Sequence, residues 1–278
     1  MRIAICSFSF HRLLAAGKQD MFRYIADCRK LGCTQLDPWN AHLAEFKKGD
    51  DIIHAGHNPD QSHHLTAVED AYIARVKVAA DKAALPFGCI AVDGAHIYDK
   101  GPAVRRANRA RAYRWIAIAE KLGAEQMRID AGGSEQMPDD EFNIICEGYT
   151  DLLKRTRAAG IQLLIENHWG PSPIPGNLIK ILDALPGLGL LFDSFNWKFG
   201  HKTEGWLECA KYAKATHMKT FAFTRDGQEL TENIPACIQL LQSAGYKGAW
   251  GVESCPLNGK EIEAARKTIA LIRKSARK

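Results

Sequence analysis

The chain has 278 residues, of which 46% are apolar and 25% are charged, the usual mixture for a soluble globular protein. A chain of this length can bury a large core, so it does not need disulfides or structural metals to fold. Its formal net charge of +5 is compatible with an anionic substrate but is weak support for nucleic-acid binding.

Short apolar runs alternate with helical patterns along the whole chain. The predicted strands span residues 2–9, 33–39, 86–92, 126–131, 161–167, 189–195, 215–221 and 249–254. The predicted helices span residues 20–31, 67–84, 104–122, 139–159, 176–184, 205–213, 234–244 and 260–275. Eight strands that alternate with eight helices are typical of a parallel sheet closed by crossover helices. We therefore predict an α/β fold, a (β/α)8 TIM barrel that forms a single domain over residues 1–278.

The segments between these elements support the assignment. Gly32, Gly123, Gly160 and Gly245 each follow a predicted helix, where glycine adopts a left-handed conformation at least cost. The longest irregular stretch, about residues 40–66, would rise over the C-terminal face of the barrel, so it is a candidate lid. It holds five of the ten histidines, for which a solvated loop is a better interpretation than a second metal site: His42, His54, His57, His63 and His64.

The eight cysteines indicate a reducing environment. None of them forms a C-x-x-C pair, and they are scattered through predicted strands and helices. We interpret them as reduced core thiols of a cytoplasmic protein. The apolar run at residues 1–6 is short and is followed by Ser7, Ser9 and His11, so we expect a first strand there rather than a signal peptide or a membrane span.

Metal-binding side chains stand at the ends of the last four predicted strands, where a TIM barrel carries its working residues. Glu166, Asp193, His217 and Glu253 each follow an apolar run. Three carboxylates that converge in a barrel mouth repel one another, and a divalent cation relieves that repulsion. Two Glu, one Asp and one His make a mixed oxygen and nitrogen site for one ion, which we expect to be Mn²⁺, with Mg²⁺, Co²⁺ and Zn²⁺ as alternatives.

These strand ends give the chain a resemblance to the xylose-isomerase-like barrel superfamily, the sugar phosphate isomerases and epimerases, over nearly its whole length. The resemblance is carried by Ile165-Glu166-Asn167-His168, Phe192-Asp193-Ser194-Phe195-Asn196, His217-Met218-Lys219 and Val252-Glu253-Ser254. It implies one divalent metal on the four residues named above. The ketose epimerase branch further implies that Glu166 and Glu253 act as an acid/base pair on opposite faces of a sugar.

The sequence also departs from the ketose epimerase pattern. Asn196 stands where that branch has a histidine three residues after the aspartate ligand, and Ser172 stands in place of an acidic residue. Phe223 replaces an arginine, although Arg225 is close enough to be a substrate-binding candidate. Lys219 is a companion of the histidine ligand in inosose dehydratases and other relatives that eliminate water. It is therefore a catalytic candidate, and elimination stays open as the reaction.

Other polar residues near strand ends are candidates beside ordinary structural interpretations. His96 could be a further acid/base or could make structural hydrogen bonds, and Arg128 could bind substrate or form a buried ion pair with Asp130, with which it shares a strand face. The remaining substrate-binding candidates could bind a sugar or simply support the fold: Asp37, Trp39, His168, Asn196 and Trp197. Trp169 could also stack on a sugar or pack.

Two functions fit this pattern best. The leading hypothesis is a metal-dependent isomerase or epimerase of a sugar, a sugar phosphate or a related hydroxy-ketone, acting through an enediolate. The alternative is a metal-dependent lyase or dehydratase of a keto-inositol or keto-sugar, including elimination from a 3-keto glycoside. Both predict a small carbohydrate as the partner, without nucleic acid or membrane, and the resemblance implies a homodimer or homotetramer.

Two further interpretations are weaker. A DNA-repair endonuclease on the same barrel needs a three-metal cluster, but Asn196 replaces a needed histidine and an Asp-x-His beyond the seventh strand is absent. A non-catalytic sugar-binding barrel is also conceivable, and the loss of turnover on substituting Glu253 separates it from an enzyme. The arginine-rich helix at residues 104–122 is typical of a solvated face rather than of a nucleic-acid-binding surface.

Overall fold

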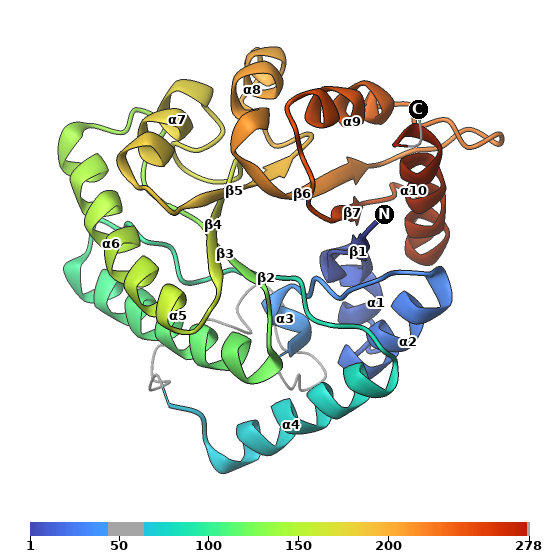
Figure 1. The fold of residues 1–278 in the computed structure, drawn as a ribbon, viewed down its shortest axis with the longest axis horizontal. Coiled ribbons are helices and arrows are strands. Elements are labelled where there is room, and N and C mark those ends of the chain that lie inside the picture. The colour runs from blue at the N-terminus through green and yellow to red at the C-terminus, as the bar shows by residue number, and fades with distance from the viewer. Residues whose placement is uncertain (44–63, 277–278) are drawn as a thin grey trace.

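A computed structural model describes residues 1–43 and 64–276 of the chain. Seven parallel strands curve around a central axis, and the helices form an outer ring around them (Figure 1). The strand order is β1-β7-β6-β5-β4-β3-β2. From β2 to β7 each strand pairs with the next one in sequence, and β1 pairs with β7 instead of β2. The strands are β1 (Ile3–Ile5), β2 (Cys89–Val92), β3 (Gln126–Ile129), β4 (Gln162–Glu166), β5 (Gly189–Asp193), β6 (Ala213–Thr220) and β7 (Trp250–Ser254).

The outer layer places most helices where the sequence predicts them. It contains α2 (Met21–Leu31), α4 (Ala67–Lys82), α5 (Pro102–Leu122), α6 (Asp139–Ala158), α7 (Pro175–Ala184), α8 (Lys202–Cys209), α9 (Ile234–Ser243) and α10 (Glu261–Ser275). The shorter helices are η1 (Ser7–Phe10), α1 (His11–Ala15), α3 (Asn40–Leu43) and η3 (Ala210–Tyr212). Proline begins α5 and α7, where its missing N–H costs nothing, and Gly32 and Gly123 end α2 and α5 in the left-handed conformation. The predicted α/β TIM-barrel fold is confirmed.

The predicted second strand forms a thin seam instead of a regular strand. Isolated parallel bridges join Asp37 to Cys6 on one side, and Leu36 to Phe87 and Trp39 to Ala91 on the other. Pro38 has no N–H to donate, which interrupts any ladder here. The segment at residues 34–39 therefore closes the barrel between β1 and β2 through isolated bridges and not through a regular ladder, and we call it the seam.

Polar side chains fill the barrel interior behind the seam. A side chain at Gly88 would place its Cβ 1.8 Å from Gln35 Nε2 and 2.3 Å from Asp37 Oδ1, so glycine leaves room for these two groups. Asp37 Oδ1 accepts hydrogen bonds from Gln35 Nε2 at 2.8 Å and from the Cys89 N–H at 3.0 Å. Because these donors hold Asp37 within the barrel, its carboxylate has a structural role in the fold.

The first predicted strand is shorter than expected. It spans Ile3–Ile5, and Ser7–Phe10 forms a 3₁₀ helix instead of continuing to residue 9. The Ser7 and Ser9 hydroxyls each accept a backbone N–H, from Trp39 at 2.8 Å and from Ser254 at 2.9 Å. These tertiary hydrogen bonds override an alternation of serine and phenylalanine that is typical of a strand.

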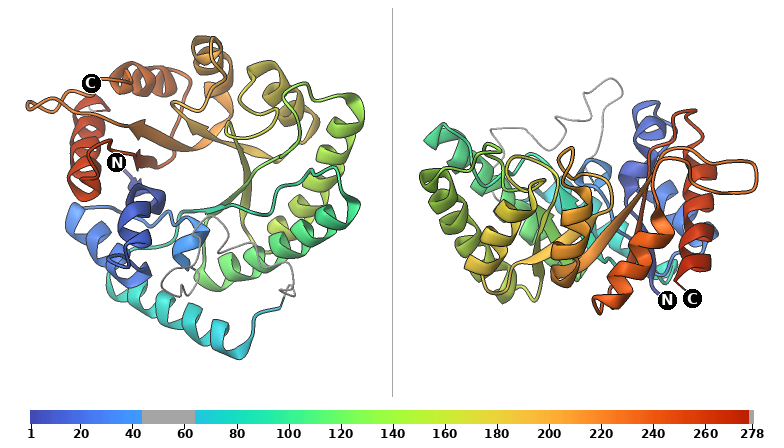
Figure 2. Two further views of the ribbon diagram at one scale, coloured as in Figure 1. Left: turned by 180° about the vertical axis from the view of Figure 1, so that it is seen from behind. Right: turned by 90° about the horizontal axis from the view of Figure 1, so that it is seen from above.

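Two sequence predictions fall mainly on residues 44–63, outside the described part of the chain. The lid predicted at about residues 40–66 is one, and the interpretation of His54, His57 and His63 is the other. The solvated-loop interpretation is wrong for His42, which is buried in α3. Among the described residues, no helix is long and apolar enough to cross a bilayer. The side view in Figure 2 shows helices around the flank of the barrel.

Candidate metal centre

Four strands bring Glu166, Asp193, His217 and Glu253 together at one end of the barrel. Glu166 and Asp193 are the last residues of β4 and β5, and β6 and β7 carry His217 and Glu253. One potential ligand atom of each residue lies within 4.8 Å of the others, and all four side chains are buried. His217 Nδ1 is 3.0 Å from Glu166 Oε1 and 3.4 Å from Glu253 Oε2. The set predicted from sequence is thus one buried cluster that could hold a metal ion.

Each carboxylate of this cluster has one oxygen atom that accepts no hydrogen bond from the described residues. Glu166 Oε2, Asp193 Oδ2 and Glu253 Oε2 are buried and accept no hydrogen bond in the described structure, although each has a cationic group beside it. Arg128 Nε is 2.9 Å from Glu166 Oε2, and Lys219 Nζ is 3.1 Å from Glu253 Oε2 and 3.4 Å from Asp193 Oδ2. Burial of three clustered carboxylates is costly, and coordination of a further cation would offset that cost. Three carboxylate oxygens beside one imidazole nitrogen form a donor set that suits a divalent metal. The residues therefore fit a divalent metal ion.

The backbone at the end of β5 fixes the direction of Asp193. Asp193 Oδ1 accepts the N–H groups of Phe195 at 2.6 Å and Asn196 at 2.8 Å, which leaves Oδ2 free. The Asn167 side chain accepts the Asp193 N–H at 2.8 Å and donates to the Asp193 carbonyl at 2.9 Å. This amide clamp joins the ends of β4 and β5 and holds the aspartate in place.

Lys219 lies inside the same cluster. The register of β6 and β7 pairs it with Glu253, and its Nζ is 3.1 Å from Glu253 Oε2 and 3.4 Å from Asp193 Oδ2. It also donates a hydrogen bond to Asn196 Oδ1 at 2.9 Å. Burial alone lowers the pKa of Lys219, but the two carboxylates raise it well above its ordinary value, so the ammonium stays charged.

A second group of charges adjoins Glu166 and is centred on Arg128. Arg128 Nη1 donates to Asp93 Oδ1 at 2.7 Å and to Asp130 Oδ2 at 2.9 Å, while its Nε is 2.9 Å from Glu166 Oε2. His168 Nδ1 lies 3.2 Å from Asp130 Oδ2 and 3.9 Å from Glu166 Oε2. His168 and Glu166 thus point to the same side, as the alternation of strand side chains predicts. The structure places Arg128 in the buried ion pair that sequence analysis weighed against substrate binding.

These surroundings shift the pKa values of Asp193 and Glu166 in opposite directions. Burial raises the pKa of Asp193 above its ordinary value, although Lys219 opposes the effect. Burial also raises the pKa of Glu166, but Arg128 and His217 outweigh it and hold that pKa below its ordinary value. Glu166 is therefore an anion at neutral pH even inside the barrel.

The remaining predicted residues lie at different distances from the cluster. Trp39 is buried and donates from Nε1 to Asp93 Oδ2 at 2.7 Å, which connects the seam to the Arg128 group. His96 is half-buried, and its carbonyl accepts a hydrogen bond from the Asn108 side chain at 3.0 Å. Trp197 packs on Phe192, with ring centroids 5.5 Å apart, as part of the main core. Its position indicates packing rather than contact with a ligand.

Two predicted substrate-binding residues occupy loops. Asn196 follows β5 and joins the cluster through Lys219. Arg225 is exposed at the turn of an outward hairpin, in which the Thr224 N–H donates to the Gln228 carbonyl at 2.9 Å. The hairpin projects away from the barrel axis in Figure 1, so the structure does not bring Arg225 to the metal-binding residues.

Sequence analysis missed three residues that support the cluster. Asn167 supplies the clamp on Asp193, and the Ser194 hydroxyl accepts the Lys219 N–H at 2.9 Å. Cys6, interpreted as an ordinary core thiol, lies beside His217 and Glu253, with ligand atoms within 4.8 Å of one another. Asn167 and Ser194 lie at the ends of predicted apolar strands, as the ligands do, and that position was the signal available in the sequence, whereas Cys6 lies inside the strand predicted at residues 2–9.

Comparison with known proteins identifies the family. The family model for the xylose isomerase-like TIM barrel matches residues 25–275. The chain belongs to this family. Members of the family share this barrel, and the resemblance seen in the strand ends is confirmed. No curated protein matches the chain by sequence.

Solved structures share the fold at low sequence identity. A 3-keto-D-glucoside 4-epimerase from E. coli has a TM-score of 0.70 at 11% identity, covering 92% of this chain and 95% of its own. A D-allulose 3-epimerase from Methylomonas sp., in complex with D-allulose, has a TM-score of 0.72 at 12% identity, with 99% and 97% coverage. A probable 3-DHS dehydratase from Bacillus anthracis has a TM-score of 0.70 at 12% identity, with 98% and 99% coverage. At such identities these matches establish the shared barrel.

Proposed function

We propose that this protein is a divalent-metal-dependent isomerase or epimerase of a keto-sugar or a related hydroxy-ketone. The observation that carries the proposal is the buried cluster of Glu166, Asp193, His217 and Glu253, in which one oxygen of each carboxylate accepts no hydrogen bond from the described residues. Two structural neighbours named as sugar epimerases support the same class of reaction. Mn²⁺ is the ion we expect on these four residues. When bound, it would supply Lewis-acid polarisation of neighbouring substrate oxygens.

The two glutamates are suited to move a proton. Both carboxylates are buried and lie beside His217, and each has a cationic group beside one oxygen, Arg128 for Glu166 and Lys219 for Glu253. In the proposed reaction one carboxylate takes the proton of the C–H bond next to the substrate carbonyl, and the bonding electrons form the enediolate. The other glutamate returns a proton to the opposite face or to the adjacent carbon, so no oxidant or reductant is consumed.

Hydrogen exchange with solvent tests this function. The Mn²⁺-loaded protein is incubated with a panel of ketohexoses and 3-keto glycosides in heavy water, and the products are examined by NMR and mass spectrometry. We expect an epimeric or isomeric product with deuterium at the exchanged carbon. Glu253→Gln should abolish turnover, while Glu261→Gln, a change in a glutamate buried elsewhere on α10, should leave it intact. Full activity of Glu253→Gln would refute the catalytic assignment.

The second candidate is a lyase that expels water or an aglycone from a keto-sugar or keto-inositol. The position of Lys219 favours it, because the Nζ lies 3.1 Å from Glu253 Oε2 and could donate a proton to a leaving group. The structural neighbour named as a probable dehydratase also supports it. Release of an unsaturated product or of the aglycone in the same panel would identify elimination, whereas an epimer with all its atoms retained excludes it.

Two properties of the whole protein complete the proposal. We propose that it acts in the cytoplasm, because all eight cysteines are free and six of them are buried. A homodimer or homotetramer is the expected assembly, which light scattering coupled to size-exclusion chromatography measures directly. A monomeric mass at micromolar concentration would contradict that expectation.

A further inference from the structure

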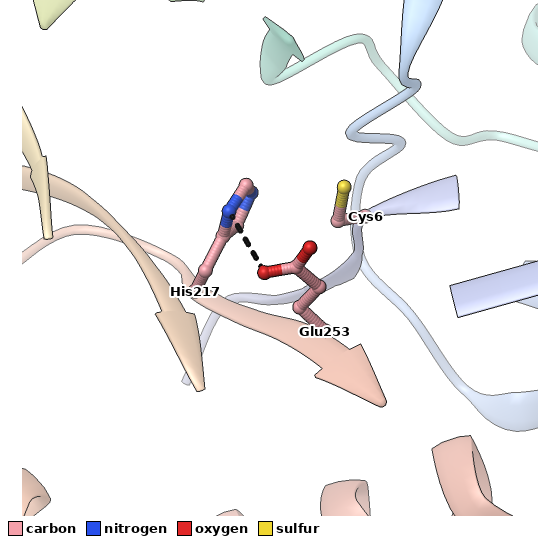
Figure 3. A group of neighbouring side chains, drawn as sticks. All are labelled: Cys6, His217 and Glu253. Carbon is pink, nitrogen blue, oxygen red and sulfur yellow. Dashed lines mark ion pairs between the residues drawn. The ribbon is translucent and has the colours of Figure 1, made fainter. Parts of the chain in front are cut away.

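Cys6 occupies a position that the proposed reaction does not use. It follows β1 directly, is 2% exposed, and lies with His217 and Glu253 in a group whose ligand atoms are within 4.8 Å of one another. Figure 3 shows the three side chains converging, with Cys6 coming from the N-terminal segment and the other two from neighbouring strands. The Cys6 Sγ therefore lies within 4.8 Å of a ring nitrogen of His217.

The orientation of His217 leaves one ring nitrogen for this contact. Nδ1 faces the carboxylates, at 3.0 Å from Glu166 Oε1 and 3.4 Å from Glu253 Oε2. A cation shared with these carboxylates would therefore lie on the Nδ1 side. A histidine that binds a metal through one nitrogen donates the N–H of the other to an outer acceptor, which fixes its tautomer and ring rotation.

We propose that Cys6 is this outer acceptor and acts as a positioning residue for His217. Its sulfur accepts the Nε2–H and thereby turns Nδ1 towards the carboxylates. The inference rests on the proposed metal site but adds a residue to it. The outer partner of such a histidine is commonly a carboxylate. Here the cluster already holds three, and a thiol provides an acceptor without adding a fourth negative charge.

The backbone makes Cys6 suitable for this role. Its N–H donates to the Val252 carbonyl at 2.8 Å, which ties it to β7, the strand that carries Glu253. On its other side a bridge joins it to Asp37 in the seam. Because the main chain is held from both sides, the sulfur has a fixed position relative to the imidazole, as an orienting group requires.

Metal affinity is the direct test, since it does not depend on knowing the substrate. Co²⁺ binding by the full-length chain is measured by competition with a chromophoric chelator for wild type, Cys6→Ala and Cys6→Ser. We expect Cys6→Ala to bind Co²⁺ roughly ten- to a hundredfold more weakly, the usual cost of losing an outer partner. Cys6→Ser keeps an acceptor and should recover most of the affinity. Cys209→Ala, at a cysteine buried in α8, should bind like wild type.

The visible and ultraviolet spectra of the Co²⁺ forms separate positioning from direct ligation. An outer role predicts no thiolate-to-cobalt charge-transfer band in wild type and a change of the d–d bands in Cys6→Ala. A charge-transfer band that disappears in Cys6→Ser would make Cys6 a ligand and overturn the proposal. Equal affinities of wild type and Cys6→Ala would overturn it as well.

Two controls keep the outcomes distinct. Thermal melting of the metal-free variants shows whether they fold. If Cys6→Ala does not fold, Cys6→Val takes its place, because valine also lacks an acceptor. The Co²⁺ affinity of Cys6→Val is then compared with that of Cys6→Ser. A wild-type protein that binds no Co²⁺ would refute the metal site itself. Failure of the Cys6 role alone would instead leave wild-type binding intact and equal in all variants.

Discussion

Lys219 lies directly opposite Glu253 in the β6–β7 register, with its Nζ 3.1 Å from a glutamate oxygen and 3.4 Å from Asp193. Its positive charge is thus the compensating charge nearest to two of the three clustered carboxylates. A metal bound to the same carboxylates would take over part of that compensation. The stability of the protein without metal and its affinity for metal should therefore both depend on Lys219.

Replacing Lys219 with Met should destabilise the metal-free protein. Loss of one partner from a buried charge group leaves the others uncompensated and costs about 3–5 kcal/mol, and a barrel of this size loses roughly 2–4 °C of melting temperature per kcal/mol. Added Mn²⁺ should raise the melting temperature of the variant more than that of wild type. Lys77→Met, which breaks an exposed pair with Asp81, serves as the control. Equal melting temperatures of wild type and Lys219→Met in EDTA would contradict this expectation.

Arg128 should be the most sensitive charged residue of the barrel to substitution. It compensates Asp93, Asp130 and Glu166, and Arg128→Met would leave buried acids unpaired, at a cost of about 3–5 kcal/mol. Arg128→Lys should rescue little, because an ammonium cannot reproduce the guanidinium fork. Urea unfolding measures both. The partly exposed pair of Arg109 and Asp151 gives the comparison, and Arg109→Met should cost no more than about 1 kcal/mol. Similar losses in both variants would show that burial of Arg128 is unimportant.

His42 should make the protein less stable in mild acid. Both its ring nitrogens are buried without a hydrogen-bond partner, and burial lowers its pKa from 6.5 to about 3. Since the unfolded chain then binds the proton more readily, stability is complete above pH 6.5 and falls as the pH is lowered towards 3. The contribution lost by pH 5 is about 2 kcal/mol. Thermal melts at pH 7 and 5 should show a smaller drop for His42→Phe than for wild type, and identical drops would exclude His42 as the cause.

Trp169 should affect substrate binding more than turnover. It is 53% exposed in the loop after β4, and its ring centroid lies 4.6 Å from that of His168. An aromatic ring at this rim that packs on a sugar contributes about 0.5–1.5 kcal/mol. Trp169→Ala should accordingly raise KM roughly two- to tenfold and leave kcat nearly unchanged. Phe199→Ala, at a fully exposed position, should change neither constant. A fall in kcat alone would assign Trp169 to the reaction rather than to binding.

The regular part of the molecule was predictable because it follows from local patterns. Apolar runs located β4 to β7, and the alternation of strand side chains placed Glu166 with His168 and His217 with Lys219. The four ligand candidates could be grouped because parallel strands end at one face of a barrel. None of these inferences needs knowledge of which distant residues touch.

The rest depended on contacts that one sequence does not reveal. The role of Cys6 follows from its place between β7 and the seam, and a buried thiol there has the same sequence context as one in the core. Because Trp197 is close in sequence to a candidate ligand, stacking on a sugar was one interpretation of it. The structure instead packs its ring against Phe192 in the core, in space that a side chain at Gly205 would occupy. The number of acids around Arg128 likewise arises from three separate segments.

The seam has a consequence for how the barrel exchanges with solvent. Its segment at residues 34–39 is joined to each neighbouring strand by isolated bridges, whereas β5, β6 and β7 pair over runs of three consecutive residues. Amide protons at Leu36 and Gly88 should therefore exchange with deuterium earlier than those of the β5–β7 core. A transient opening there would separate β1 from β2 without breaking the pairs that hold Asp193 and His217. The barrel can therefore open locally at the seam while the metal-binding residues on the opposite side keep their positions.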